Sequence, residues 1–367
     1  MKLKERLSQT GMPKRKASFT VTGVWNWFVV SPVCALIVSF LISGILIAFL
    51  GYNPFLTYGY LLTGAFGGID QIVGSLALMT PVLFCALSHM LGSRVGLSNL
   101  GMEGQFLGGA MTAALVALAC PASMGHLPTV VICLASGALM GGLIAAVPAI
   151  IHRRLGGSEM LISLMLNYVV DLFTIYLLHD VVQNPDNITP ATSPIGDHAK
   201  LTQLSPGTQL TTGFLLAVVI AALLWIFLYK SVPGYKLRAI GVNPSAARFK
   251  GMNEKRTRMW AFIVAGCIAG IGGAVQIQGV HYSFIQGMSP GYGWDGVSAA
   301  LLGSCEPFGV ILGSFVFGAL RSGSMYLGRM YSVPSDFIYM LEGTMMLFIA
   351  APAILRKLKR ETKKAEA

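Results

Sequence analysis

The sequence predicts an all-α membrane protein of about ten transmembrane helices. Of its 367 residues, 54% are hydrophobic and only 11% are charged, whereas soluble domains carry about 25% charged residues. Its apolar runs are long enough to cross about 30 Å of hydrocarbon at about 1.5 Å per residue. Lys and Arg gather at the ends of alternate runs, as they do in the cytoplasmic loops of membrane proteins.

The expected spans cover residues 28–50, 72–91, 100–120, 129–151, 160–178, 212–229, 259–280, 292–303, 308–320 and 337–355. The eighth and ninth are short. The first run is much longer than the apolar core of a signal peptide, so we expect it to remain as an anchor. A polar, turn-rich segment over 181–210 is either an irregular external loop or a docking surface for an external partner. Residues 51–70 suit a helix lying on the bilayer.

The distribution of cations sets the expected orientation. Six precede the first span, eight lie between the sixth and seventh, and six close the chain, whereas Lys200, Arg321 and Arg329 fall elsewhere. We therefore expect basic cytoplasmic tails over 1–27 and 356–367, a membrane domain over 28–355, and a cytoplasmic loop over 231–257. The net charge of +11 reflects this topology and does not indicate nucleic acid.

Two copies of the pattern G-x-[DE]-G suggest two inverted halves. Residues 101–104 open the third span and residues 293–296 open the eighth, which runs in the opposite direction. Such a pair is typical of inverted-repeat transporters. Coincidence in a chain with 43 glycines is the alternative.

Polar groups inside the spans mark the candidate substrate path, because charges in a bilayer are costly. The intramembrane acids are Glu103, Asp171, Asp295 and Glu342. For Glu103 and Asp295, an acid that complements the helix dipole in a first turn is the structural alternative; for Asn167 it is an ordinary interhelical hydrogen bond. The candidate path residues are Asn99, Glu103, Gln105, Asn167, Trp294 and Asp295.

Two well-known catalytic patterns, the phosphate-binding loop and the zinc-protease motif, are missing from the sequence. No lysine follows a glycine, so the phosphate-binding loop G-x4-G-K-[ST] cannot occur, and H-E-x-x-H is absent as well. The six cysteines form no CxxC and have no histidine at metal-ligand spacing. We therefore expect a chain that is not an enzyme and binds no metal or cofactor.

The basic segment in the middle of the chain predicts a short, rigid helix on the cytoplasmic side. Asn243 is a good N-cap, Pro244 suits the first helical position, and Gly251 suits a left-handed C-terminal position. Phe249 and Met252 are apolar groups available for contact. A helix with both caps, placed between the two halves, could transmit force from a soluble partner.

These motifs resemble the permease subunits of ABC importers of the branched-chain amino acid and ribose type. LRAIGVNPSAARFKGMN is similar to their cytoplasmic coupling loop, while NLGMEGQ, SEMLISLMLNYV and GYGWDGVSAALLGS resemble motifs of the nucleoside permeases associated with basic membrane lipoproteins. Ser158 and Leu97-Ser98 depart from the family pattern. The resemblance implies a role in ATPase coupling for Arg238, Gly241, Asn243, Pro244, Ala246, Ala247, Arg248 and Gly251.

The resemblance also implies an assembly in a bacterial inner membrane. Its partners would be a second permease, related but different, a cytoplasmic ABC ATPase that uses the ATP, and an extracytoplasmic substrate-binding lipoprotein. The implied substrate is a nucleoside, with riboflavin or a ribose-type sugar as alternatives. An alternative of another class is an ion-coupled secondary transporter, in which Glu103 or Asp295 would bind a proton or sodium ion.

Overall fold

In a computed structural model, the chain is described over residues 37–184, 189–205, 207–331, 339–340 and 343–344. Within these ranges helices dominate, and β structure is limited to three isolated bridges. The expected tails 1–27 and 356–367, Glu342, and most of the expected tenth span lie outside the described residues. The first span is described only from residue 37, as the helix Ile37–Phe49.

Seven helices of the described chain are long and apolar enough to cross a membrane. They are α3 (Ile69–Arg94), α4 (Met102–Ala119), α5 (His126–Leu155), α6 (Glu159–Leu177), α7 (Thr212–Lys230), α10 (Glu254–Gln276) and α12 (Pro307–Tyr331). The π-helical turn η2 (Leu178–Val182) extends α6, and a second π-helical turn, η4 (Ile277–His281), extends α10. The shorter elements are α2 (Pro54–Phe66), η1 (Ala122–Met124), η3 (Asp197–Ala199), α8 (Val232–Val242), α9 (Pro244–Phe249) and α11 (Tyr292–Leu302).

These helices confirm the second to seventh expected spans, with small shifts at their ends. The eighth expected span is helical, as α11, but its 11 residues are not among the seven helices long enough to cross a membrane. The ninth span was predicted to stop at residue 320, and that boundary is wrong, because α12 continues to Tyr331. The charge of Arg321 suggested a loop, but its side chain is buried and paired with Asp295, so the helix does not end there. The sequence also did not predict α8, which Ser231 caps through the Gly234 amide.

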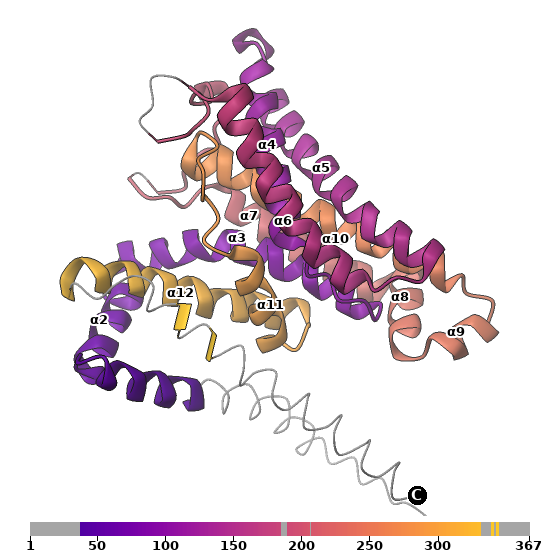
Figure 1. Cartoon of the computed structure of the whole chain (residues 1–367), viewed down its shortest axis with the longest axis horizontal. Coiled ribbons are helices and arrows are strands. Elements are labelled where there is room, and N and C mark those ends of the chain that lie inside the picture. Colours follow the sequence, from indigo (N-terminus) through magenta and orange to yellow (C-terminus); the bar gives the residue numbers. More distant parts are fainter. Residues whose placement is uncertain (1–36, 185–188, 206, 332–338, 341–342, 345–367) are drawn as a thin grey trace, which may run out of the picture.

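Helix α5 packs closely on α10, and both run beside α4 (Figure 1). Gly137 and Gly141 on α5 face Gly266 and Gly270 on α10. A Cβ on Gly270 would lie 2.1 Å from the Gly137 carbonyl oxygen, and one on Gly141 would lie 2.3 Å from the Gly266 oxygen. Small residues spaced four apart allow such close backbone approach between membrane helices.

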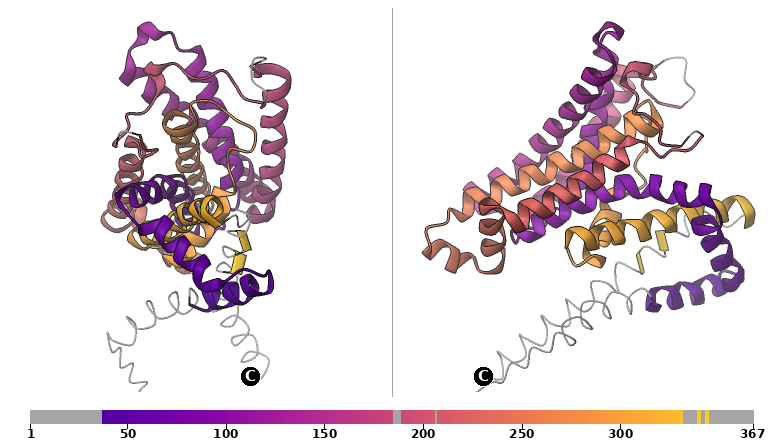
Figure 2. Two further views of the ribbon diagram at one scale, coloured as in Figure 1. Left: turned by 90° about the vertical axis from the view of Figure 1, so that its left-hand side faces the viewer. Right: turned by 180° about the vertical axis from the view of Figure 1, so that it is seen from behind.

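The two ends of the bundle carry different features (Figure 2). Helices α8 and α9 project from one end, and the connection between α6 and α7 lies at the other. Between residues 51 and 70 the chain forms α2, which Asn53 caps by accepting from the Phe55 amide at 3.0 Å. It packs on α12, where Gly64 lies against Tyr326. Its placement on a bilayer surface stays a prediction.

Candidate functional site

Helix α4 begins deep in the bundle rather than at its end. After α3 ends at Arg94, the chain turns back along α3, so that Asn99 lies beside Ser88 and His89. The side-chain amide of Asn99 donates to the Ser88 hydroxyl at 3.1 Å, and the backbone carbonyl of Asn99 lies 2.9 Å from His89 Nδ1. Six residues separate Ser88 from Arg94, which corresponds to about 9 Å of helix rise. An irregular segment at this depth is allowed only because protein surrounds it.

The start of α11 meets the start of α4 at this depth. The Gly293 amide donates to Glu103 Oε2 at 2.6 Å, and a Cβ on Gly293 would lie 2.7 Å from the Glu103 nitrogen. The two G-x-[DE]-G motifs therefore touch one another, at the first turns of two helices. Each supplies an acid to its own first turn, where a negative charge complements the helix dipole.

Three amide side chains hold the start of α4 in place. Asn99 and Gln105 hydrogen bond each other through 3.0 Å and 3.2 Å contacts, and Asn99 Oδ1 accepts from the Gly101 amide. Asn167 reaches across from α6, accepting from the Gly104 amide at 2.9 Å and donating to the Leu100 carbonyl at 2.7 Å. These bonds satisfy backbone groups that a helix start leaves without partners.

Asp295 and Arg321 form an ion pair inside the bundle. Arg321 Nη2 lies 2.5 Å from Asp295 Oδ2, and both side chains are almost completely buried. The guanidinium also donates to the Pro290 carbonyl at 3.1 Å and lies over the Tyr292 ring. The pair fixes α11 to α12 and compensates the charge of Asp295.

A cavity of about 230 Å³ opens beside the meeting helix starts. It is lined by Glu103, Leu107, Asn167, Tyr168, Asp171, Thr174, Ile175, Phe284, Gln286, Gly287, Ser289 and Trp294. Of the six candidate path residues, Glu103, Asn167 and Trp294 line it. Asn99 and Gln105 do not, because they are fully buried in the network behind it. Asp295 borders a separate cavity of about 280 Å³, together with Trp294 and Ser298.

The α6 wall of this cavity contains residues that the sequence analysis did not place in the path. Asn167, Asp171 and Thr174 follow one another at intervals of four and three, which puts them on one helix face. That spacing could have identified Asp171 and Thr174 from the sequence, since polar groups on one face of an apolar span are unusual. Tyr168 beside them carried no comparable signal.

The segment between α6 and α7 packs over one side of the cavity. The Thr192 amide donates to the Phe284 carbonyl at 2.9 Å, and the Phe284 amide donates to the Thr192 hydroxyl at 3.0 Å. The Ile195 amide donates to the Tyr282 carbonyl at 2.7 Å. The described part of this segment is thus fastened over the connection between α10 and α11, which supplies Phe284 and Gln286 to the cavity.

At the opposite end, the short helix α9 has the caps that the sequence predicted. Asn243 Oδ1 accepts from the Ala246 amide at 3.0 Å, Pro244 is the first residue, and Gly251 has a left-handed φ of 76°. One face of α9 is anchored, because Ala247 is only 4% exposed, whereas Phe249 is 93% exposed. The helix therefore presents a large apolar side chain to whatever lies beyond it.

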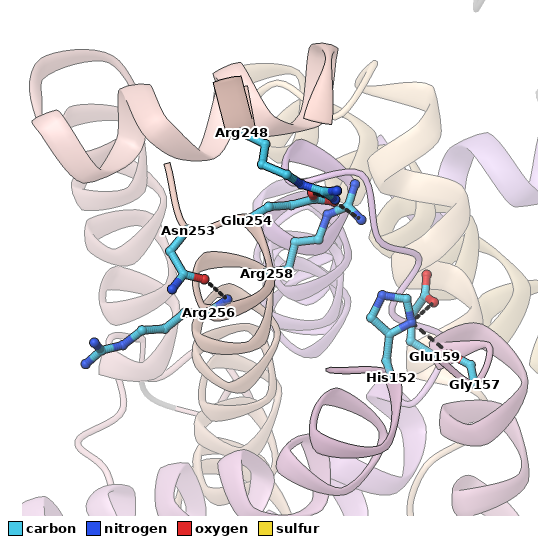
Figure 3. Close-up of polar contacts among 8 residues, drawn as sticks. All are labelled: His152, Gly157, Glu159, Arg248, Asn253, Glu254, Arg256 and Arg258. Atoms are coloured by element: carbon cyan, nitrogen blue, oxygen red, sulfur yellow. Dashed lines mark hydrogen bonds and ion pairs between the residues drawn. The ribbon is translucent and has the colours of Figure 1, made fainter. Parts of the chain in front are cut away.

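An acid at the start of α10 connects it with α9 (Figure 3). Glu254 binds Arg248 at 2.6 Å and Arg258 at 2.9 Å. Helix α8 is held separately: Arg238 donates to the Leu228 carbonyl at 3.0 Å, and Gly241 packs on the Arg94 carbonyl. Four predicted coupling residues, Arg238, Gly241, Ala247 and Arg248, thus contact the bundle. A fifth, Ala246, is exposed.

A second polar contact at this end joins α5 to α6 (Figure 3). His152 Nδ1 lies 2.8 Å from the Gly157 carbonyl and 3.1 Å from Glu159 Oε2. Ser158 caps α6 by accepting from the Leu161 amide.

The sequence model of the branched-chain amino acid transport system / permease component family matches residues 71–350. The chain belongs to this family. With its apolar helices, this makes it a multi-pass membrane permease. No solved structure matches the chain.

Three relatives have permease names. The nucleoside ABC transporter permease protein NupB of Lactococcus lactis subsp. cremoris (strain MG1363) is 30% identical, over 92% of this chain and 95% of its own. The guanosine ABC transporter permease protein NupP of Bacillus subtilis (strain 168) is 29% identical, over 91% of this chain and 96% of its own. The nucleoside permease NupC, from the same Lactococcus strain, is 26% identical, over 76% of this chain and 90% of its own.

Proposed function

We propose that this chain is a permease subunit of an ATP-driven importer that carries nucleosides across a bacterial inner membrane. The single observation that carries the substrate class is the composition of the cavity between α4, α6 and α11, and the names of the relatives agree with it. The chain forms the translocation path and binds no cofactor of its own.

The cavity is suited to a neutral, hydrogen-bonding molecule with a flat ring. Within the described chain its lining includes two carboxylates, from Glu103 and Asp171, and no lysine or arginine. Carboxylates accept from ribose hydroxyls and base N–H groups, and they repel phosphates and carboxylates. Trp294 and Tyr168 offer rings on which a base can stack. A nucleotide or an amino acid carboxylate would find no cationic partner there.

Asp171 supports the presence of a second permease. It lies midway along α6, exposed, and its neighbours Leu172 and Tyr168 are also exposed. A carboxylate facing lipid at this depth would be unfavourable, so protein or an aqueous path should cover this face. A related but different permease is the natural partner, because the chain resembles two nucleoside permeases, NupB and NupC, of a single strain.

Energy would come from a cytoplasmic ABC ATPase, and substrate from an extracytoplasmic binding lipoprotein. Both termini and α9 would lie in the cytoplasm, in accord with the distribution of cations. Phe249 would contact the ATPase, and α9 would transmit its movement to α8 and α10. A secondary transporter would need Asp295 or Glu103 to bind an ion. Both already have partners: Asp295 pairs with Arg321, and Glu103 accepts from the Gly293 amide.

Competition measurements on the assembled importer in proteoliposomes test the substrate class. Unlabelled nucleosides should compete with labelled guanosine uptake, whereas the matching 5′-nucleotides and leucine should not. Trp294→Ala should raise the half-saturating guanosine concentration about tenfold, since base stacking on an aromatic side chain contributes roughly 1–3 kcal/mol. Trp294→Phe, which keeps a ring, is the matched control. Equal competition by nucleotides or leucine would contradict the assignment.

A further inference from the structure

A second concave surface lies outside the substrate cavity, at the end of the bundle that carries α9. It is a groove of about 270 Å³ between α7, α8 and α10, close to the end of α3. Its walls are mainly apolar and include Leu91, Phe227, Pro233, Trp260, Ala261 and Val264. Although α10 is mostly buried, Trp260 is 52% exposed and Val264 is 44% exposed along this groove. It is therefore open toward the surroundings of the bundle.

Two cations line the groove, Lys236 from α8 and Arg256 from α10. Within the described part of the chain, neither forms an ion pair with an acidic side chain. Glu254, two residues before Arg256, is already bound by Arg248 and Arg258. Figure 3 shows the Arg256 side chain pointing away from that cluster. The groove thus combines an apolar wall with two positive charges that have no internal counter-ion in these ranges.

The order of groups along α10 matches an amphiphile with an anionic head. Arg256 stands near the start of the helix, Trp260 follows one turn later, and Val264 one turn beyond that. The eight steps from Arg256 to Val264 correspond to about 12 Å of helix rise, enough to reach from a headgroup region into the acyl-chain region. Tryptophan is enriched at this membrane interface, and basic pockets on the cytoplasmic side bind anionic headgroups.

We infer that the groove binds an anionic phospholipid of the cytoplasmic leaflet. Its phosphate would lie between Lys236 and Arg256, and one acyl chain would lie along Trp260 and Val264. Such a lipid would bridge α8 and α10, the two helices that flank α9. This inference requires the chain to be in a membrane, but it does not depend on which molecule the permease transports.

Brominated lipids test this site, because bromine on an acyl chain quenches a tryptophan that it contacts. The assembled importer would be placed in vesicles of phosphatidylcholine with a small fraction of brominated phosphatidylglycerol, and separately with brominated phosphatidylcholine. The part of the quenching that disappears in the Trp260→Phe variant reports lipid contact within the groove. We expect brominated phosphatidylglycerol to quench Trp260 at a much lower mole fraction than brominated phosphatidylcholine does.

The double variant Lys236→Gln/Arg256→Gln should remove this preference. Each cation near an anionic lipid contributes roughly a fivefold gain in binding, so the pair should account for about 30-fold. Lys250→Gln/Lys255→Gln removes the same charge from exposed positions outside the groove and should keep the preference. Equal quenching by both lipids would mean ordinary bulk contact, and no quenching by either would mean that protein covers the groove. Either result would overturn the inference.

Discussion

Asp295 and Arg321 show how a single contact changes the interpretation of a charged residue. From the sequence, Asp295 was a candidate for the substrate path and Arg321 a cation beyond the end of a span. In the structure they neutralise one another inside the bundle, with an N–O distance of 2.5 Å. Breaking a buried pair leaves an uncompensated charge, which is far more destabilising than replacing both partners.

We therefore expect Arg321→Met to lower the free energy of unfolding by about 3–5 kcal/mol, because it strands the buried Asp295 carboxylate. Asp295→Leu combined with Arg321→Met should recover most of this loss. Arg329→Met is the matched control, since Arg329 lies on the same helix and bonds only the Met325 carbonyl among described partners. Thermal unfolding of the purified variants measures the effect, and equal stability of the two single variants would contradict the buried-pair account.

At the same scale, the sequence could indicate polar residues in the membrane but not which way they face. Asn99, Gln105 and Asn167 all qualified as polar groups within apolar runs. Only the fold shows that Asn99 and Gln105 hydrogen bond each other behind the cavity, whereas Asn167 lines it. The return of the chain along α3 decides this, and no local pattern predicts that return.

At the scale of the helices, prediction worked where apolar runs were long and uninterrupted. It failed for the end of α12, where a charged residue lies inside the helix. It also failed for α8, because its sequence contains proline and glycine, which are unfavourable in helices. The caps of α9 were predictable because Asn243, Pro244 and Gly251 act through local backbone geometry. Packing between α5 and α10 depends on residues far apart in sequence, although their G-x-x-x-G spacing suggests a contact.

Gly270 tests that packing. A Cβ there would lie 2.1 Å from the Gly137 carbonyl oxygen, so Gly270→Ala must push α5 and α10 apart. We expect a loss of about 1–3 kcal/mol in unfolding free energy, in the range of overpacked cores. Gly59→Ala in α2 is the control, because a Cβ there meets no atom within 4 Å. The packing model would be wrong if both alanine variants unfolded at the same temperature.

At the scale of the whole molecule, the orientation rests on charge distribution and can be read by labelling. Within the segment between α6 and α7, Thr192 is fully buried whereas Ser193 is exposed, so Ser193 is a suitable position for a label. In a background without the native cysteines, Ser193→Cys should react with an impermeant thiol reagent from outside. Ser245→Cys on α9 should react only from the cytoplasmic side. The reverse pattern would invert the proposed topology.

ATP-driven uptake tests the central claim most directly. Labelled guanosine uptake would be followed in proteoliposomes that contain the permease, its partner permease, the ATPase and the binding lipoprotein. Ala247 is 4% exposed on the anchored face of α9, so Ala247→Asp should displace that helix while leaving the membrane helices in place. Ala247→Ser keeps a small side chain and serves as control.

We expect uptake that requires ATP, persists when ion gradients are dissipated, and is lost in Ala247→Asp but retained in Ala247→Ser. Uptake that stops when ion gradients are collapsed, or that continues normally in Ala247→Asp, would contradict the coupling of this permease to an ATPase through α9.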